Sequence, residues 1–159
     1  MSKLTLTVTL LSILAFGIAV PRAGAAPGDA CSLLTAAQIK SATGADASPG
    51  VAGSAKLCQW NASMAPGATV NFVTLVLQDP KFFDSGKNVP APANAPARAI
   101  ITPVFGVGDD AYFVAVRDQV GLVVKKGSSA FKVAVYAKLP NAQKESMEKA
   151  LATQIASQL

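Results

Sequence analysis

The segment from Thr69 to Leu77 is rich in β-branched residues and predicts a strand that is apolar on both faces. Its apolar residues alternate in two sets, Val73, Leu75 and Leu77 on one face and Val70, Phe72 and Val76 on the other. A strand with this pattern is typical of a central position in a sheet that is covered on both sides. The core is therefore predicted to form around this strand.

Further segments carry the short, apolar patterns of strands. They are residues 57–61, 99–105, 111–116, 122–125 and 131–137. The last two flank a Gly-Ser-Ser turn and predict a hairpin. The stretch from Ala45 to Lys56 is rich in alanine, serine, glycine and proline, so it is predicted to be a loop. Together with two helices, these segments predict an α+β fold with a mainly antiparallel sheet of about five or six strands.

The helix expected over residues 35–43 has clear signals at both ends. Thr35 is the predicted N-cap, and Gln38 three residues later completes a capping box. Leu34 can pack against Ile39 as a hydrophobic staple, and Gly44 is placed to end the helix in a left-handed conformation. A short helix near the start of the domain is therefore expected.

A second helix is predicted over residues 142–158, capped at Pro140-Asn141. Its apolar stripe, formed by Met147, Leu151 and Ile155, is expected to dock on the sheet. A brief helical turn is also predicted to start at Asp79-Pro80, with Asp79 as its cap and Pro80 at its first position. Phe82 and Phe83 are its expected anchors.

The N-terminal segment has the three parts of a secretory signal peptide. Lys3 is followed by an apolar run from Leu4 to Val20 and by Ala23-Gly24-Ala25, which predicts cleavage after Ala25. A transmembrane anchor and a lipoprotein lipidated at Cys31 are the alternatives. Several hydroxylated residues interrupt the apolar run, and the residues before Cys31 lack the lipidation pattern. The chain is thus predicted to divide into a signal peptide, residues 1–25, and one exported domain, residues 26–159, with no stable membrane span after cleavage.

Cys31 and Cys58 are the two cysteines of the chain. In an oxidising compartment they are predicted to form a disulfide, which would stabilise the fold by roughly 3–4 kcal/mol. A catalytic thiol is the alternative, but the sequence holds no histidine to activate one.

The composition excludes several classes of function. With no histidine, the chain cannot use a Ser-His-Asp triad, Cys-His catalysis or a two-histidine zinc site. The full chain has a net charge of +5, and removal of the predicted signal peptide, with Lys3 and Arg22, would leave a mild +3. Because no Lys/Arg cluster is present either, no nucleic-acid partner is expected. No pattern identifies catalytic, cofactor-binding or metal-binding residues, and no cofactor is predicted.

Two loops form the predicted binding surface. Pro90, Pro92 and Pro96 favour an extended, polyproline-like loop, which serves as a lid or as a simple connector. Asp109 and Asp110 follow two glycines, a pattern that favours a turn over a calcium site because too few oxygen ligands are adjacent. These five residues are the candidate surface for a partner.

Several short motifs together resemble a family of small exported bacterial domains, most of them uncharacterised. The motifs are C-S-L-L-T at 31–35, C-Q-W at 58–60, G-V-G-D-D-A-Y-F at 106–113 and a valine-rich hairpin containing Lys125-Lys126-Gly127. The resemblance implies a PsbP-like fold, with an antiparallel sheet between helices, and an exported location. Some members are lipid-anchored, whereas this chain lacks their lipidation motif. The family supplies no catalytic residues to carry over.

These observations predict a non-catalytic binding or accessory module of the cell envelope, in the periplasm or outside the cell. Its partner would be an envelope protein or a small ligand. One alternative is a histidine-independent hydrolase that uses carboxylates or a Ser/Lys pair, which would need polar side chains converging in a pocket. A second alternative is a purely structural envelope protein, which would bind no small ligand.

Overall fold

The computed structural model describes residues 29–63, 70–87 and 99–159. These residues form an α+β fold with one antiparallel sheet of eight strands, three α-helices and a short 3-10 turn, Ala30–Ser32. The strands are β1 Asp46–Ala47, β2 Val51–Ser54, β3 Leu57–Ser63, β4 Val70–Gln78, β5 Ile100–Val104, β6 Asp110–Val116, β7 Gln119–Lys126 and β8 Ser129–Ala137. The helices are α1 Ala36–Thr43, α2 Lys81–Lys87 and α3 Asn141–Ala156. The predicted signal peptide lies outside the described residues.

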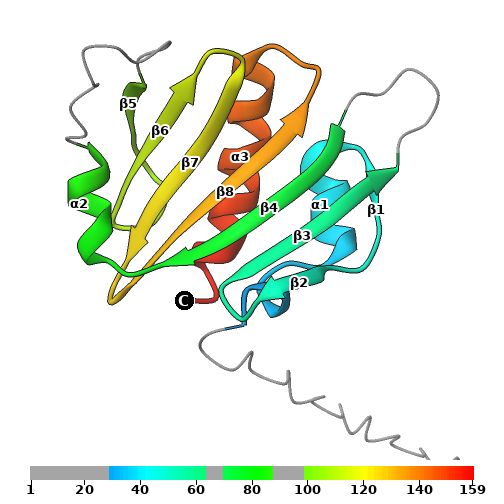
Figure 1. Cartoon of the computed structure of the whole chain (residues 1–159), viewed down its shortest axis with the longest axis horizontal. Coiled ribbons are helices and arrows are strands. Elements are labelled where there is room, and N and C mark those ends of the chain that lie inside the picture. The colour runs from blue at the N-terminus through cyan, green and yellow to red at the C-terminus, as the bar shows by residue number, and fades with distance from the viewer. Residues whose placement is uncertain (1–28, 64–69, 88–98) are drawn as a thin grey trace, which may run out of the picture.

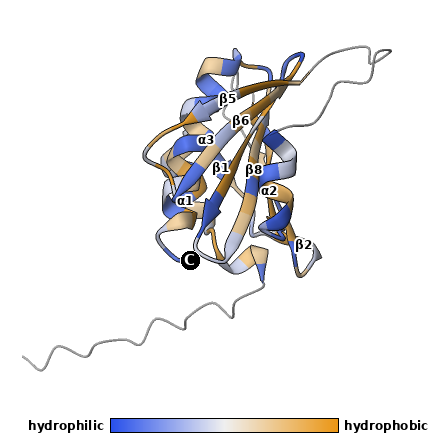
Figure 2. Cartoon of the chain, turned by 90° about the vertical axis from the view of Figure 1, so that its left-hand side faces the viewer, coloured by the Kyte–Doolittle hydropathy of each residue, from blue (hydrophilic) through white to orange (hydrophobic). Residues whose placement is uncertain are grey.

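The sheet has the order β1-β3-β4-β8-β7-β6-β5, and β2 pairs with β3 beside β1 (Figure 1). Helices α1 and α3 lie on one side of the sheet and α2 on the other (Figure 2). The larger core lies under α1 and α3. Its largest buried members include Trp60, Ile39, Leu75, Leu122, Phe131, Leu151 and Ile155.

Strand β4 occupies a central position, as predicted, but its two faces are not equally covered. Val73 and Leu75 are fully buried against the helices, whereas Phe72 and Val76 on the opposite face are only half-buried. Val70 was expected on that opposite face, yet it lies in the larger core. The pairing of β4 with β8 shifts between Val70 and Phe72, and this irregularity turns Val70 inward.

Helix α2 covers one end of the second face. Phe83 is fully buried there with Tyr112, Val123 and Ala130, and its ring centroid lies 5.1 Å from that of Tyr112. Phe82, the other predicted anchor, is 58% exposed, so that prediction was wrong. In a helix this short, neighbouring side chains point in different directions, and only one of them can reach the sheet.

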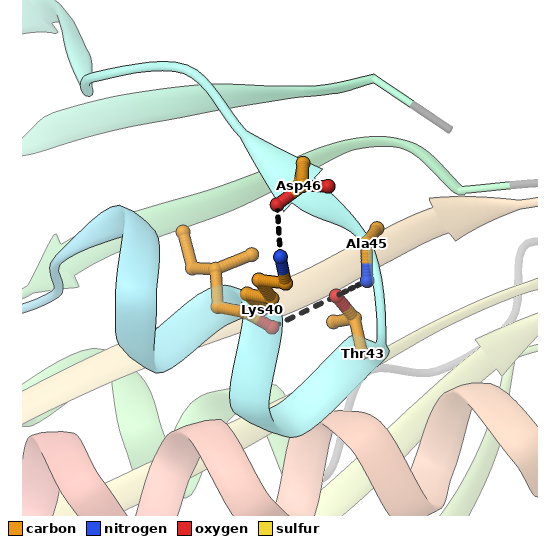
Figure 3. A network of polar contacts seen from close by, with 5 residues as sticks. Lys40, Thr43, Ala45 and Asp46 are labelled. Atoms are coloured by element: carbon orange, nitrogen blue, oxygen red, sulfur yellow. Dashed lines mark hydrogen bonds and ion pairs between the residues drawn. The ribbon is translucent and has the colours of Figure 1, made fainter. Parts of the chain in front are cut away.

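Helix α1 forms as its end signals predict. Thr35 and Gln38 make the complete capping box, and Gly44 ends the helix with φ 73°. Polar contacts then join the helix to β1 (Figure 3). Thr43 Oγ1 donates to the Ile39 carbonyl and accepts from the Ala45 amide, and Lys40 Nζ lies 2.6 Å from Asp46 Oδ1.

The predicted disulfide links Cys31 to Cys58, with Cα atoms 5.0 Å apart. It joins the 3-10 turn before α1 to β3, so the start of the described chain is covalently tied to the sheet. Cys58 is fully buried in the larger core.

The sheet has more strands than the five or six expected, because β1 and β2 form in the stretch predicted to be a loop. Both pair with β3, β1 at Ala62 and Ser63 and β2 from Leu57 to Gln59. Strand β2 is exposed along its whole length. Strand β2 is therefore defined by its pairing with β3, because it has no apolar pattern of its own.

Candidate functional site

The Asp109-Asp110 turn lies beside the β7–β8 hairpin, and both carboxylates are engaged within the protein. Asp109 accepts from the Gly127 amide at 2.7 Å and from Lys126 Nζ at 2.8 Å, and Asp110 forms an ion pair with Lys87. The Gly127 amide and the Lys126 ammonium hold the pKa of the Asp109 carboxyl below its usual value. We call this part of the molecule the closed end of the sheet.

The predicted candidate surface is therefore only partly described. Asp109 and Asp110 use different lysines and do not converge on one place where a ligand could sit. Pro90, Pro92 and Pro96 lie outside the described residues. The two aspartates fix the turn, which agrees with the turn interpretation of their sequence.

A pocket of about 520 Å³ lies at the other end of the sheet, which we call the open end. Its walls come from β4, the β6–β7 turn, the end of β8 and the connection to α3. The lining residues are Asn71, Phe72, Asp118, Gln119, Tyr136, Ala137, Lys138, Leu139, Pro140 and Lys144. None of them was singled out from the sequence as a site residue.

Two aromatic rings form an apolar wall of this pocket. Phe72 of β4 and Tyr136 of β8 are paired across the two strands and stack with their ring centroids 4.3 Å apart and an interplanar angle of 21°. Both side chains are half-buried, so part of the stacked pair remains accessible. A flat apolar surface with this exposure can contact the apolar face of a small molecule.

Irregular strand pairing makes room for the pocket. The shift between Val70 and Phe72 leaves Asn71 without a partner in the register of β8 and exposes it at the pocket. Bulges of this kind redirect a side chain and are common beside binding sites. In addition, the pairing of β7 with β8 ends at Leu122 and Val133, although β7 begins at Gln119 and β8 continues to Ala137. The two strands separate at the open end.

The β6–β7 turn forms another wall and has a strained backbone. Val116 pairs with Gln119, so Arg117 and Asp118 are the two turn residues. Arg117 has φ 56°, and it is the non-glycine residue with positive φ in the described chain. Tight hairpin turns usually place glycine, asparagine or aspartate where φ must be positive.

Helix α3 holds both carbonyls of this turn. Asn141 Nδ2 donates to the Arg117 carbonyl at 3.3 Å, and Lys144 Nζ donates to the Asp118 carbonyl. The predicted cap at Pro140-Asn141 is thus only partly correct: Pro140 occupies the N-cap position without a side-chain hydrogen bond, and Asn141 is the first helical residue. The Asn141 side chain bonds to the turn and does not cap the helix.

Five polar side chains at the pocket form no side-chain hydrogen bond or ion pair within the described structure. They are the Asn71 and Gln119 amides, the Asp118 carboxylate, the Tyr136 hydroxyl and the Lys138 ammonium. The group offers donors and acceptors in similar numbers. Unlike the closed end, the open end presents polar groups that are available to a ligand.

Two charged residues of α3 are buried at the pocket, Lys144 in its lining and Glu148 behind it. Lys144 is 1% exposed, and Glu148, one turn further along the helix, is 0% exposed. Glu148 Oε1 accepts from the Val135 amide at 2.8 Å, whereas Oε2 has no hydrogen-bond partner. Val135 lies two residues beyond the last β7–β8 pair, so the Glu148 carboxyl bonds to an amide for which β7 supplies no paired residue.

Burial raises the pKa of Glu148 to about 8. The Val135 hydrogen bond and the positive charges of Lys144 and Lys132 act in the opposite direction but do not outweigh it. The predicted stripe of α3 identified the buried Leu151 and Ile155, but not that Lys144 and Glu148 lie on the buried side as well. The signal in the sequence was the spacing of four residues between Lys144 and Glu148, which places both on the same face of the helix.

Within the described residues, no group of three or more Cys, Asp or Glu side chains is arranged to hold a metal ion. No helix in the same residues has both the length and the apolar character needed to cross a membrane. Comparison with protein-family models, curated proteins and solved structures finds no match to this chain.

Proposed function

We propose that this protein is an exported, non-catalytic binding module, and that its open-end pocket takes a small polar molecule with one flat apolar face. The pocket carries this proposal, because a stacked aromatic pair, which includes the Tyr136 hydroxyl, lies beside four other polar side chains that have no partner in the described structure. A few placed polar groups around an apolar surface are typical of ligand sites. Since the free groups include both an ammonium and a carboxylate, a ligand without large net charge suits them best.

Binding is favoured over hydrolysis by the composition of the pocket. Its described lining contains one carboxylate, Asp118, and no serine. Glycoside hydrolysis needs two convergent carboxyl groups, and a Ser/Lys mechanism needs a serine next to its base. Glu148 is fully buried and is not part of the lining, so it does not supply the second carboxyl group there.

Export is supported by two independent features. The sequence has the parts of a signal peptide up to Ala25, and the Cys31–Cys58 disulfide is compatible with an oxidising compartment. We further propose membership of the PsbP-like exported family, on the motifs named above. Mass spectrometry of the protein secreted or exported by an expressing bacterium should give a chain that begins at Ala26. A chain that retains Met1 to Ala25 after export would contradict the predicted cleavage.

Ligand binding can be tested by thermal unfolding of the purified, oxidised protein. The panel contains neutral mono- and disaccharides, dipeptides and inorganic phosphate. A ligand present at about 100 times its dissociation constant adds roughly 2.7 kcal/mol to the free energy of unfolding and raises Tm by several degrees. We expect a neutral compound to cause this rise and phosphate to cause none.

Matched variants locate the binding. Tyr136→Ala removes half of the stacked pair and should abolish the rise in Tm. Phe82→Ala removes an aromatic ring that is 58% exposed and lies outside the pocket, so it should leave the rise unchanged. No rise with any compound, or equal loss in both variants, would contradict binding in this pocket.

A further inference from the structure

The wall of the pocket depends on a contact that starts in the helix layer. Lys144 reaches from α3 to the Asp118 carbonyl, and Asn141 reaches the Arg117 carbonyl. Arg117 is kept at φ 56°, a conformation that non-glycine residues adopt at an energetic cost. The Val116–Gln119 pair closes the turn, and the two contacts from α3 help to hold its strained shape. Lys144 supplies the charged contact.

Glu148 is the ionisable group best placed to disturb that contact. It lies four residues after Lys144, so the two side chains project from the same face of α3. Both are almost fully buried, which strengthens the attraction between opposite charges. Glu148 Oε2 has no hydrogen-bond partner and can accept one from an ammonium group.

We propose that loss of a proton from Glu148 to solvent draws the Lys144 ammonium away from the Asp118 carbonyl and so loosens the turn that forms one wall of the pocket. The protonated form, in which Lys144 holds the turn, is the binding-competent form. As the pH rises through the titration of Glu148, the turn relaxes and the pocket changes shape. This inference rests on the proposed function only in treating the pocket as a binding site.

The charges around Glu148 allow this coupling. Lys132 of β8 and Lys144 and Glu145 of α3 act on its titration. From α1, Lys40 is engaged with Asp46, and the β7 lysines, Lys125 and Lys126, lie at the closed end. Asp118 faces the pocket from the turn. Of the two cations that act on Glu148, Lys144 is the one that also touches the pocket wall.

The test uses the free, oxidised protein, so it does not depend on any ligand. The sequence contains only two glutamates, Glu145 and Glu148, so selective ¹³C labelling of glutamate gives two side-chain carboxyl signals. Carbonyl ¹³C shifts of Asp118 are followed in the same samples from pH 5 to pH 10. We expect one glutamate carboxyl and the Asp118 backbone carbonyl to titrate with a common midpoint near 8.

Three variants separate the proposal from simpler explanations. Glu148→Gln should remove the midpoint from both signals, and Glu145→Gln should leave it in place. Lys144→Met keeps the Glu148 titration and should shift its midpoint upward, since a neighbouring cation is lost, while the Asp118 carbonyl no longer follows it. The last variant keeps the test informative if Glu148→Gln does not fold.

An Asp118 carbonyl that does not change while Glu148 titrates would overturn the coupling, as would a midpoint near 8 that persists in Glu148→Gln. Neither result would affect the thermal test of ligand binding. Conversely, a pocket that binds nothing in the panel would leave the measured coupling intact and contradict only the proposed function.

Discussion

The two ends of the sheet use similar residues in opposite ways. At the closed end, Asp109 and Asp110 are paired with Lys126 and Lys87, and an aromatic pair is buried between α2 and the sheet. At the open end, the strands separate, an aromatic pair remains half-exposed, and a carboxylate, two amides and an ammonium have no partner in the described structure. The comparison indicates that strand register decides which charges and rings hold the fold together and which are free to meet a ligand.

The largest effect is expected from the buried acid behind the open end. Glu148 has its pKa raised from 4.5 to about 8 in the folded protein. Its contribution is therefore most favourable below pH 4.5 and is lost progressively as the pH rises to about 8, on the order of 5 kcal/mol in all. Urea unfolding of Glu148→Gln should show a much flatter dependence on pH than the original protein. Glu145→Gln, on the same helix but half-buried, should keep the original slope.

The aromatic pairs give a direct comparison of the two ends. Phe83→Ala removes a fully buried ring and should lower the free energy of unfolding by about 3–5 kcal/mol. Phe72→Ala removes a half-buried ring from a stacked pair and should cost only about 1 kcal/mol. Denaturant titration of both variants tests this, and similar losses would show that the open end is as tightly packed as the closed end.

The strained turn at the open end predicts a stabilising substitution. A non-glycine residue in the left-handed conformation costs about 1–2 kcal/mol, and Arg117→Gly removes this cost. The greater backbone freedom of glycine in the unfolded chain offsets part of the gain. The net gain in the free energy of unfolding should be about 0.5–1 kcal/mol. Gly127→Ala, in the closed-end turn with φ 56°, should be destabilising in the same assay. A loss of stability in Arg117→Gly would mean that the arginine side chain holds the turn.

The smallest effect is expected in the comparison of Asp109, whose carboxylate is paired, with Asp118, whose carboxylate is not. Asp109→Asn loses a charge that Gly127 and Lys126 stabilise, so Tm should fall slightly at pH 7 and the fall should shrink in high salt. Because the pKa of Asp109 is lowered from 3.8, this contribution is present above that pH and disappears as the pH falls through the folded-state pKa. Asp118→Asn should leave Tm unchanged at both salt concentrations, and an equal fall in both variants would remove the distinction.

Local signals in the sequence predicted much of the fold. The capping box at Thr35 and Gln38, the left-handed Gly44 and the Cys31–Cys58 disulfide are all confirmed. So are the α+β class and the central position of β4. These features depend on neighbouring residues, on residue chemistry or on alternation along a strand, which a single sequence displays.

The open-end site could not be predicted in the same way, because it depends on pairing between distant segments. The shift that exposes Asn71 and buries Val70 is set by the register of β4 against β8. The sequence does not show where the pairing of β7 with β8 ends, because both segments continue as valine-rich strand patterns beyond that point. Glu148 looks like an ordinary surface residue of a polar helix until α3 is placed on the sheet.

The margins of the sheet have a consequence for how the protein behaves when many copies are crowded together. On one side, β3 is bordered by two short strands, β1 and β2, and on the other β5 carries Pro103, which has no backbone amide to donate. A neighbouring copy that approaches either side would therefore not find a long, uninterrupted row of donors and acceptors. Interruptions of this kind oppose fibril growth by edge-to-edge addition of further copies.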